Sequence, residues 1–255
     1  MLDRFEMTNG YVCAYRVGVG GPAGRVLIVP PFGVPASVLG IVADELAGEG
    51  FEAITLDVRN HVGKGSGRMI DFSLPAVVDD CREAIRRYEP TAVVGLSLGA
   101  RAALRAMATS PASPTAVLMI PVVEMRATLK TVLGYDPLFH HDVPEVEEVL
   151  GHRIRSAPFV DGALMHDLFS IEGTIRDLVD HGGRITLIPA DADPWVDLSS
   201  VALVADAARL DGASIDVVPV PGDEHELHKH PELALRMISA AVSEVVREHR
   251  LATVA

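Results

Sequence analysis

Short runs of consecutive apolar residues recur along the chain, separated by segments with the periodicity of amphipathic helices. Uninterrupted apolar runs are typical of strands that are buried on both faces of a parallel sheet. The pattern predicts strands at 25–29, 52–57, 91–95, 116–120, 184–188 and 214–220, helices at 35–49, 72–88, 198–210 and 231–247, and an earlier antiparallel strand at 11–18. Because strands and helices alternate, we expect an α/β fold with a mostly parallel, doubly wound sheet.

The alternation is interrupted between the strands at 116–120 and 184–188. The intervening segment is helical in pattern, at 123–130, 145–150 and 159–180, with loops between these parts. A long segment without a strand, placed between two strands of one sheet, is expected to lie over the sheet as a lid. We therefore predict one domain over residues 1–255, with a helical lid insertion at 122–183.

Composition narrows the class of protein. The 255 residues are 49% hydrophobic and carry a formal net charge of -13, so a basic surface for DNA or RNA is not expected. No apolar run approaches the roughly 18 residues of a membrane span, and the N-terminal residues lack the basic and apolar regions of a signal peptide. The two cysteines, Cys13 and Cys81, have no framework spacing. We expect them to be reduced, in a cytoplasmic protein.

One apolar run leads directly into Gly95-Leu-Ser-Leu-Gly99, and a segment rich in Ala, Leu and Arg follows it. A strand, a tight turn and a helix are expected here, with Ser97 at the turn. Such a turn lifts the serine hydroxyl clear of the sheet, and the flanking glycines let neighbouring elements approach closely. Ser97 is therefore the candidate nucleophile. The alternative is an ordinary turn that contains a serine.

A serine hydroxyl is a weak nucleophile that needs a neighbouring base, and the base needs a carboxylate to orient it. Asp191 and Asp193 follow the strand at 184–188, and His225 follows the strand at 214–220. These strand ends meet at the edge where open α/β sheets place their sites. We predict Ser97, Asp193 and His225 as the catalytic residues. Asp193 is preferred because it begins an Asp-x-x-Val sequence, and Asp191 is interpreted as a solvated turn or cap residue.

Two more histidines, His228 and His230, follow His225 closely. A metal site built from the three is the less favoured interpretation, because Glu and Lys stand between them and no cysteine is near. We predict no metal and no cofactor.

An oxyanion hole needs two backbone N–H groups. One is expected from Leu98, directly after the nucleophile, and the other from the loop that follows the strand at 25–29. Pro30 and Pro31 have no N–H, so Phe32 is the candidate there. The alternative for Phe32 is a simple core aromatic.

With these residues in place, the chain resembles an α/β-hydrolase. More narrowly, it resembles the myristoyl-ACP-specific thioesterase family of the bacterial bioluminescence (lux) operon. The turn at Ser97 departs from that family, whose serine turn is looser than the complete Gly-x-Ser-x-Gly found here. The similar stretches cover most of the chain: Asp57-Val-Arg-Asn-His-Val-Gly-Lys-Gly-Ser-Gly67, Val122-Val-Glu-Met-Arg-Ala-Thr-Leu129, Gly151-His-Arg153, Asp191-Ala-Asp-Pro-Trp-Val196 and Gly222-Asp-Glu-His-Glu-Leu227.

The resemblance implies a serine thioesterase or acyltransferase that cleaves acyl-ACP or acyl-CoA thioesters through an acyl-Ser97 intermediate. His61, Met125 and Trp195 lie in the similar stretches and are the predicted substrate-binding residues. Arg126 is a further candidate, and a structural role is the alternative for both His61 and Arg126. Further apolar residues of the insertion are expected to line an acyl pocket or to form the core of the lid: Val122, Val123, Leu129, Val132, Leu133, Phe139, Phe159, Leu164, Met165 and Phe169.

An acyl carrier protein is the partner that such a substrate would bring. Carrier proteins are acidic, and so is this chain, so docking would need a local basic patch. The candidates for that patch are Arg101, Arg105, Arg126 and Lys130. Two other functions stay open: a carboxylesterase that acts on oxygen esters with the same triad, and a non-catalytic ligand-binding protein with this fold.

Overall fold

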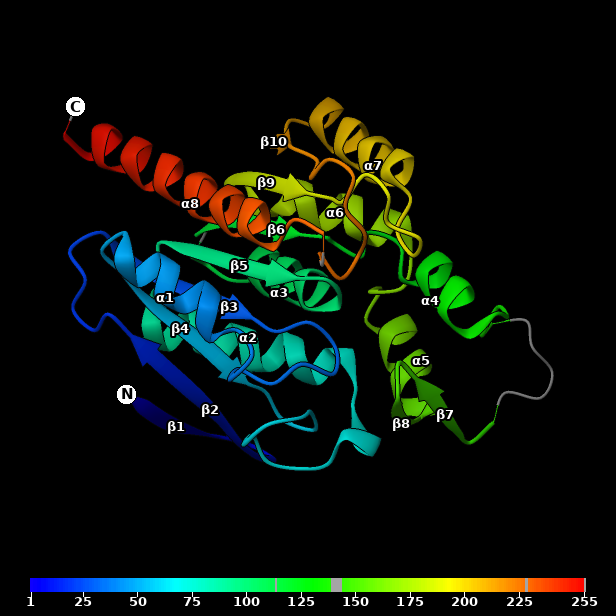
Figure 1. Cartoon of the computed structure of the whole chain (residues 1–255). Helices are drawn as coiled ribbons and strands as arrows, with labels where there is room; N and C mark the ends of the chain where they lie inside the picture. The colour runs from blue at the N-terminus through cyan, green and yellow to red at the C-terminus, as the bar shows by residue number, and fades with distance from the viewer. Residues whose placement is uncertain (113, 139–143, 228, 255) are drawn as a thin grey trace.

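The computed structural model describes residues 1–112, 114–138, 144–227 and 229–254 and has one large sheet at its centre (Figure 1). Within these residues the sheet has eight strands in the order β1-β2-β4-β3-β5-β6-β9-β10. β2 is antiparallel to both β1 and β4, and the other neighbours are parallel, which confirms the predicted fold class. The strands are β1 (Leu2–Met7), β2 (Gly10–Val17), β3 (Gly24–Val29), β4 (Phe51–Asp57), β5 (Ala92–Leu96), β6 (Thr115–Met119), β9 (Arg184–Ile188) and β10 (Ser214–Val217).

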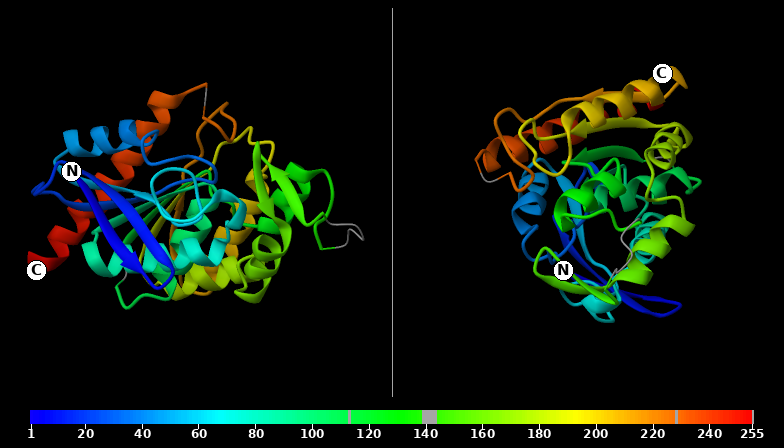
Figure 2. Two further views of the ribbon diagram at one scale, coloured as in Figure 1. Left: turned by 90° about the horizontal axis from the view of Figure 1, so that it is seen from below. Right: turned by 90° about the vertical axis from the view of Figure 1, so that its right-hand side faces the viewer.

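Helices cover both faces of the sheet (Figures 1 and 2). Along β3, Val26 and Ile28 pack into one apolar cluster, whereas Leu27 and Val29 pack into another. Because both faces of the strand are buried, its sequence is an unbroken apolar run. The first cluster contains residues of α1 (Gly40–Gly48) and α8 (Pro231–Val254), and the second contains residues of α2 (Leu74–Tyr88), α3 (Leu98–Ala108), α6 (Ile171–His181) and α7 (Leu198–Leu210).

Some elements at the edges of the fold differ from the prediction. The prediction lacks β1, because this strand has no apolar run: three of its six residues are exposed and only Phe5 is buried. The helix predicted from residue 35 begins at Gly40, after a stretch of turns. The strand predicted to end at residue 220 ends at Val217. A short 3₁₀ helix, η1 (Met69–Asp71), precedes α2.

The segment between β6 and β9 is only partly helical. It contains α4 (Met125–Leu133), the hairpin β7 (Val146–Val149) and β8 (His152–Arg155), α5 (Ser156–Met165) and α6. The helix predicted at 145–150 is therefore wrong. Leu150 and Gly151 both have positive φ and turn the chain back on itself, and this local turn overrides the helical preference of the glutamates before it.

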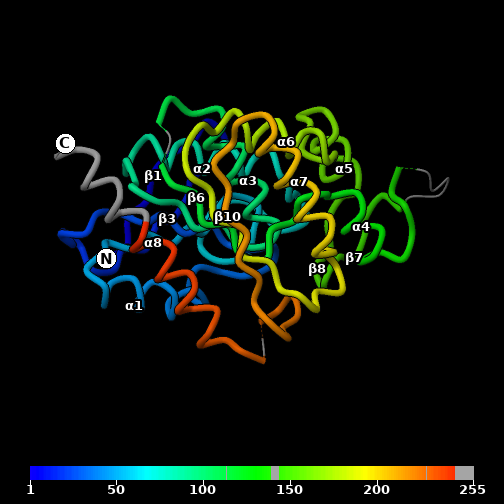
Figure 3. Tube along the Cα trace, turned by 90° about the horizontal axis from the view of Figure 1, so that it is seen from above, coloured from blue at the N-terminus to red at the C-terminus, as the bar shows by residue number. Residues whose placement is uncertain are grey.

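The same segment divides into two parts in space. α6 packs against α3 and α7 and belongs to the helical layer on the sheet. The part before α6, with α4, β7, β8 and α5, extends beyond the carboxyl ends of the parallel strands (Figures 1 and 3). Arg155 on β8 forms an ion pair with Asp71 of η1, which fastens this part to the body of the domain.

Both cysteines are buried free thiols. Burial raises the pKa of the Cys81 thiol far above its ordinary value, so this group stays protonated and unreactive. In the described part of the chain, no helix combines the length and the apolar character needed to cross a membrane.

Candidate active site

Ser97 occupies the sharp turn between β5 and α3. Its backbone has φ 52° and ψ -122°, a strained conformation for a residue with a side chain. The Ser97 N–H donates to the Met119 carbonyl at 3.0 Å, which fastens the turn to β6. A Cβ on Gly99 would lie 2.1 Å from the Pro30 carbonyl oxygen, and one on Gly95 would lie 2.7 Å from a helix Cα atom. Only glycine fits either position, as the Gly-x-Ser-x-Gly pattern predicts.

The three predicted catalytic residues form one hydrogen-bonded chain. Ser97 Oγ lies 2.6 Å from His225 Nε2, and His225 Nδ1 lies 2.6 Å from Asp193 Oδ2. All three side chains are almost fully buried. The second carboxylate oxygen of Asp193 accepts the backbone N–H groups of Trp195 and Val196. Both carboxylate oxygens are therefore held, and the imidazole is oriented with its Nε2 toward the serine.

Asp191 has a different place from Asp193. It is exposed, and its Oδ1 accepts the Gly222 N–H at 2.6 Å, so it joins the loop after β9 to the loop that carries His225. A backbone bridge between Ala190 and Val220 joins the same two loops. The acid and the base of the site therefore stand on loops that are bonded to each other.

Asp223 is a residue of this site that the sequence reasoning missed. It is fully buried two positions before His225, and its carboxylate accepts the N–H groups of Glu224, Lys229 and His230. Burial opposes its ionisation, but these donors outweigh burial and lower the pKa of Asp223. The signal in the sequence was the turn Pro-Gly-Asp, in which an Asp often binds backbone N–H groups.

The other histidines of this region do not join the chain. His230 is exposed at the start of α8, and His228 lies outside the described residues. Among the residues that are described, no group of three His, Cys, Asp or Glu side chains is placed to hold a metal ion.

Both residues predicted for the oxyanion hole lie at the cavity beside Ser97. Phe32 and Leu98 both line this cavity, together with Ser97 and His225. Within the described residues neither the Phe32 N–H nor the Leu98 N–H has a hydrogen-bond acceptor. Donors that stay free beside a nucleophile can stabilise negative charge on a bound carbonyl oxygen.

His61 does not line the cavity at Ser97. It contacts the loop that carries Phe32. Its Nε2 accepts the Gly33 N–H at 2.9 Å, so the neutral ring carries its proton on Nδ1. Burial lowers the pKa of His61 to about 4. The ring packs edge-on against Phe32, with centroids 6.3 Å apart. This placement corresponds to the structural alternative for His61.

The cavity at Ser97 is small and mostly apolar. Its volume is about 40 Å³. Met125 and Trp195, two of the predicted substrate-binding residues, line it. The complete lining consists of Phe32, Ser97, Leu98, Val122, Met125, Thr128, Leu129, Val132, Val149, Leu150, Phe159, Trp195 and His225.

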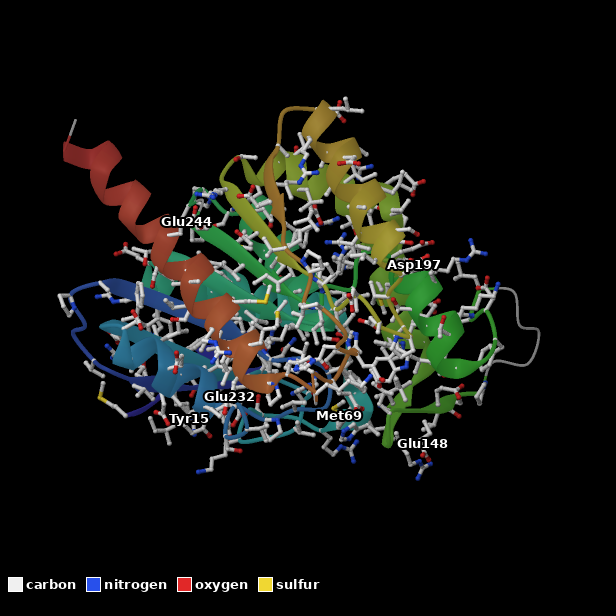
Figure 4. All side chains as sticks on the ribbon, turned by 45° about the horizontal axis from the view of Figure 1, so that its top comes forward. Tyr15, Met69, Glu148, Asp197, Glu232 and Glu244 are labelled. Carbon is white, nitrogen blue, oxygen red and sulfur yellow. The ribbon has the colours of Figure 1, made fainter. Side chains whose placement is uncertain are left out.

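A larger and more polar groove of about 410 Å³ adjoins this cavity. It lies between α4 and the start of α7, where Figure 4 labels Asp197. Glu124, Asp191 and Asp197 line the groove, and Thr128 and Trp195 line both spaces. Trp195 packs on the His225 ring with centroids 4.6 Å apart, so it stands at the boundary between the groove and the cavity.

Other apolar residues predicted to line an acyl pocket lie elsewhere. Val123 lines the polar groove, and Phe169 is buried in the core. Leu164 and Met165 are on the surface, 41% and 82% exposed, because this side of α5 faces away from the cavity. Phe139 lies outside the described residues.

Three of the four residues predicted to form a basic patch for a carrier protein are paired with carboxylates of this chain. Arg101 is 1% exposed and pairs with Asp177, and Arg105 pairs with the same carboxylate. A docking patch needs both residues on the surface, but α6 packs on α3, and its Asp177 holds both side chains. Arg126 is bound to Asp136, and Lys130 is exposed.

Comparison with known proteins gives the family. The family model of an acyl transferase matches residues 25–242. An acyl transferase of Photobacterium leiognathi is 28% identical over 195 residues, which are 73% of this chain and 60% of the relative. One of Aliivibrio fischeri (strain MJ11) is 27% identical over 195 residues, 73% of this chain and 62% of the relative. The matched region thus spans less than two thirds of either relative.

Solved structures share the α/β-hydrolase fold. Est1E from Butyrivibrio proteoclasticus, with ferulic acid bound, has a TM-score of 0.79 at 16% identity, covering 96% of this chain and 98% of that one. A monoacylglycerol lipase of Paleococcus ferrophilus has a TM-score of 0.68 at 19% identity, covering 92% and 98%. At these identities the likeness is one of fold.

Proposed function

The chain belongs to this acyl transferase family, and on that premise we propose that it is a serine enzyme that transfers acyl groups through a covalent acyl-Ser97 intermediate. The observation that carries the proposal is the hydrogen-bonded chain from Ser97 through His225 to Asp193, with both distances at 2.6 Å. A hydroxyl with an oriented base beside it is an activated nucleophile.

In the first half of the reaction, Ser97 Oγ attacks the acyl carbonyl carbon while its proton passes to His225 Nε2. Asp193 stabilises the imidazolium that forms, through its bond to Nδ1. The carbonyl oxygen becomes negatively charged and accepts the N–H groups of Phe32 and Leu98. The bond to the leaving group then breaks, and His225 gives the proton to the departing sulfur or oxygen.

In the second half, water or another acceptor takes the place of the leaving group. His225 removes its proton as it attacks the acyl-Ser97 carbonyl carbon. The second tetrahedral intermediate breaks down with return of the proton to Ser97 Oγ, which frees the carboxylic acid or the new ester. The part of the insertion before α6, which extends beyond the strand ends, acts as the lid of this site.

Acyl thioesters, as acyl-CoA or acyl-ACP, are the proposed substrates, on the strength of the family. The internal pairing of Arg101 and Arg105 removes two of the four residues proposed for carrier docking, which favours a small thioester over the carrier protein. The buried, reduced thiols support a cytoplasmic location. Oxygen esters are the second candidate, since the same triad serves both.

The test is turnover of a panel of acyl thioesters and matched oxygen esters by the wild type and by Ser97→Ala. We expect cleavage that disappears in the variant, and labelling of the wild type alone by a serine-directed fluorophosphonate. Absence of both turnover and labelling would refute the serine mechanism. A higher kcat/KM for the oxygen esters than for thioesters of the same acyl group would move the assignment to a carboxylesterase.

A further inference from the structure

The loop between β3 and α1 carries Phe32, and a side chain from another part of the chain holds its backbone. Residues 30–36, here called the Phe32 loop, form turns and irregular backbone. The Gly33 N–H of this loop donates to Nε2 of His61, which follows β4, at 2.9 Å. Because this N–H belongs to the peptide group that joins Phe32 to Gly33, the bond fixes the direction of that group.

A second bond ties the far end of the Phe32 loop to the end of β4. Asp57, the last residue of β4, accepts the Ala36 N–H on Oδ1 at 2.7 Å. Its Oδ2 accepts the Tyr15 hydroxyl and the Lys64 N–H, each at 2.8 Å. Both oxygens of Asp57 are therefore engaged, and His61 supplies the bond next to Phe32.

His61 is suited to accept this hydrogen bond. The residue is 7% exposed, and burial lowers its pKa to about 4, so the ring is neutral near pH 7. A neutral imidazole has one nitrogen without a proton, and here Nε2 is the one that meets the Gly33 N–H. The ring packs against Phe72 with centroids 5.7 Å apart, which holds the acceptor in place.

The backbone and the ring contacts leave the Phe32 loop little freedom. Gly33 has a φ of 75°, and a Cβ there would lie 2.5 Å from Nε2 of His152 on β8, so only glycine fits. The Phe32 ring packs on Phe72 with centroids 5.0 Å apart. Phe32 is thus held on one side by its ring and on the other by the peptide group that His61 binds.

We propose that His61 is a positioning residue for acyl transfer, which directs the Phe32 N–H toward the substrate carbonyl oxygen by accepting the Gly33 N–H. His61 does not line the cavity at Ser97, so it acts without touching the substrate. An N–H stabilises the transition state when it lies within hydrogen-bond distance of the charged oxygen. This inference rests on the proposed function and adds to it a residue outside the triad.

The experiment compares His61→Leu with His61→Gln. Leucine fills much of the space of the ring but accepts no hydrogen bond, whereas the side-chain oxygen of glutamine can take the place of Nε2. Displacement of a catalytic group by about 1 Å costs about 100-fold in rate. We therefore expect kcat to fall about 100-fold in His61→Leu with KM unchanged, and His61→Gln to recover most of the loss.

The assay uses the p-nitrophenyl ester that the wild type cleaves fastest. Rates are expressed per active serine, counted from the final extent of fluorophosphonate labelling, so that an unfolded fraction does not lower kcat. His181→Leu is the matched control, because His181 is also a buried histidine, 1% exposed at the end of α6, and does not line the cavity. It should keep the wild-type kcat. If His61→Leu does not fold, His61→Phe takes its place, since it keeps a ring and lacks the acceptor.

The outcomes separate the hydrogen bond from packing. A folded His61→Leu protein with the wild-type kcat per labelled serine would overturn the proposal. So would a His61→Gln protein as slow as His61→Leu, because the loss would then come from the missing ring. A loss confined to KM would also overturn it and assign His61 to substrate binding. A wild type that cleaves no ester or thioester of the panel and takes no label would instead refute the proposed function itself.

Discussion

Replacing Asp223 by Ala tests whether the loop that carries the catalytic base is held by one buried carboxylate. The change leaves three backbone N–H groups without their acceptor, at distances of 2.9, 3.3 and 2.9 Å in the native structure. An unsatisfied buried donor costs about 1–3 kcal/mol. The three residues that donate are exposed and can turn partly to water, so we take the lower end, about 3 kcal/mol in all.

A loss of this size should lower the midpoint of thermal unfolding by about 6–12 °C for a chain of this length. Activity should fall as well, because His225 stands two residues after Asp223 and loses its anchor. We expect kcat/KM to drop at least tenfold at a temperature where the variant is folded. A displacement of a catalytic group by about 1 Å can lower the rate by about 100-fold, which is more than the drop expected here.

The assays are urea and thermal unfolding together with kcat/KM on the substrate that the panel identifies. Asp44→Ala, on the exposed side of α1, is the control for removal of a carboxylate. Asp223→Asn keeps one oxygen acceptor and should lie between the wild type and Asp223→Ala. An Asp223→Ala protein with wild-type midpoint would refute the energetic reasoning, and a destabilised but fully active one would refute the link to His225.

The pH dependence of the same residue has a definite sign. The folded-state pKa of Asp223 lies below its ordinary value of 3.8. Its contribution to stability is therefore complete above the unfolded pKa and is lost as the pH falls through the folded one. Below pH 4 the wild type should lose more free energy of unfolding than Asp223→Ala does.

Three further predictions concern residues that pack around the candidate active site. Gly99→Ala should cost about 3 kcal/mol by thermal unfolding, because its Cβ would strike a backbone carbonyl, whereas Gly48→Ala, with no atom within 4 Å, should be neutral or stabilising. Burial lowers the pKa of His61 to about 4, so the unfolding free energy should fall as the pH drops from 6.5 to 4, and less so in His61→Gln. Asp177→Ala strands the buried Arg101 guanidinium and should cost about 3–5 kcal/mol in urea unfolding.

Much of the fold and of the candidate triad could be predicted because each produces a pattern in a short stretch of sequence. A strand covered on both faces is an apolar run, and a nucleophile at a strained turn needs glycines at fixed positions. The order of Ser97, Asp193 and His225 then follows from the strand ends that the sheet brings together. These features depend on neighbours in the chain or on the topology of the sheet, which alternation of strands and helices determines.

Other features depend on contacts between distant segments, and these the sequence did not show. Arg101 and Arg105 have the spacing of a solvated helix face, and only the packing of α6 on α3 turns that face inward. Glu147 and Glu148 favour a helix locally, and the turn at Leu150 and Gly151 decides for a hairpin. Asp223 has the sequence pattern of an ordinary turn residue, and only the fold shows that Lys229 and His230, just before α8, donate to its carboxylate.

The reaction and the choice of acyl group depend on different parts of this chain. The chemistry of the site rests on loops at the ends of sheet strands, where the prediction and the structure agree in placement. The wall of the acyl cavity comes from α4, β7 and α5, in the segment whose hairpin was mistaken for a helix. A family resemblance carried by the motifs at the strand ends therefore supports the acyl-transfer reaction far more than it supports a chain length. Acyl size therefore has to be measured on this chain itself, and Met125, Leu129 and Phe159, which line the cavity at Ser97, are the first positions to vary.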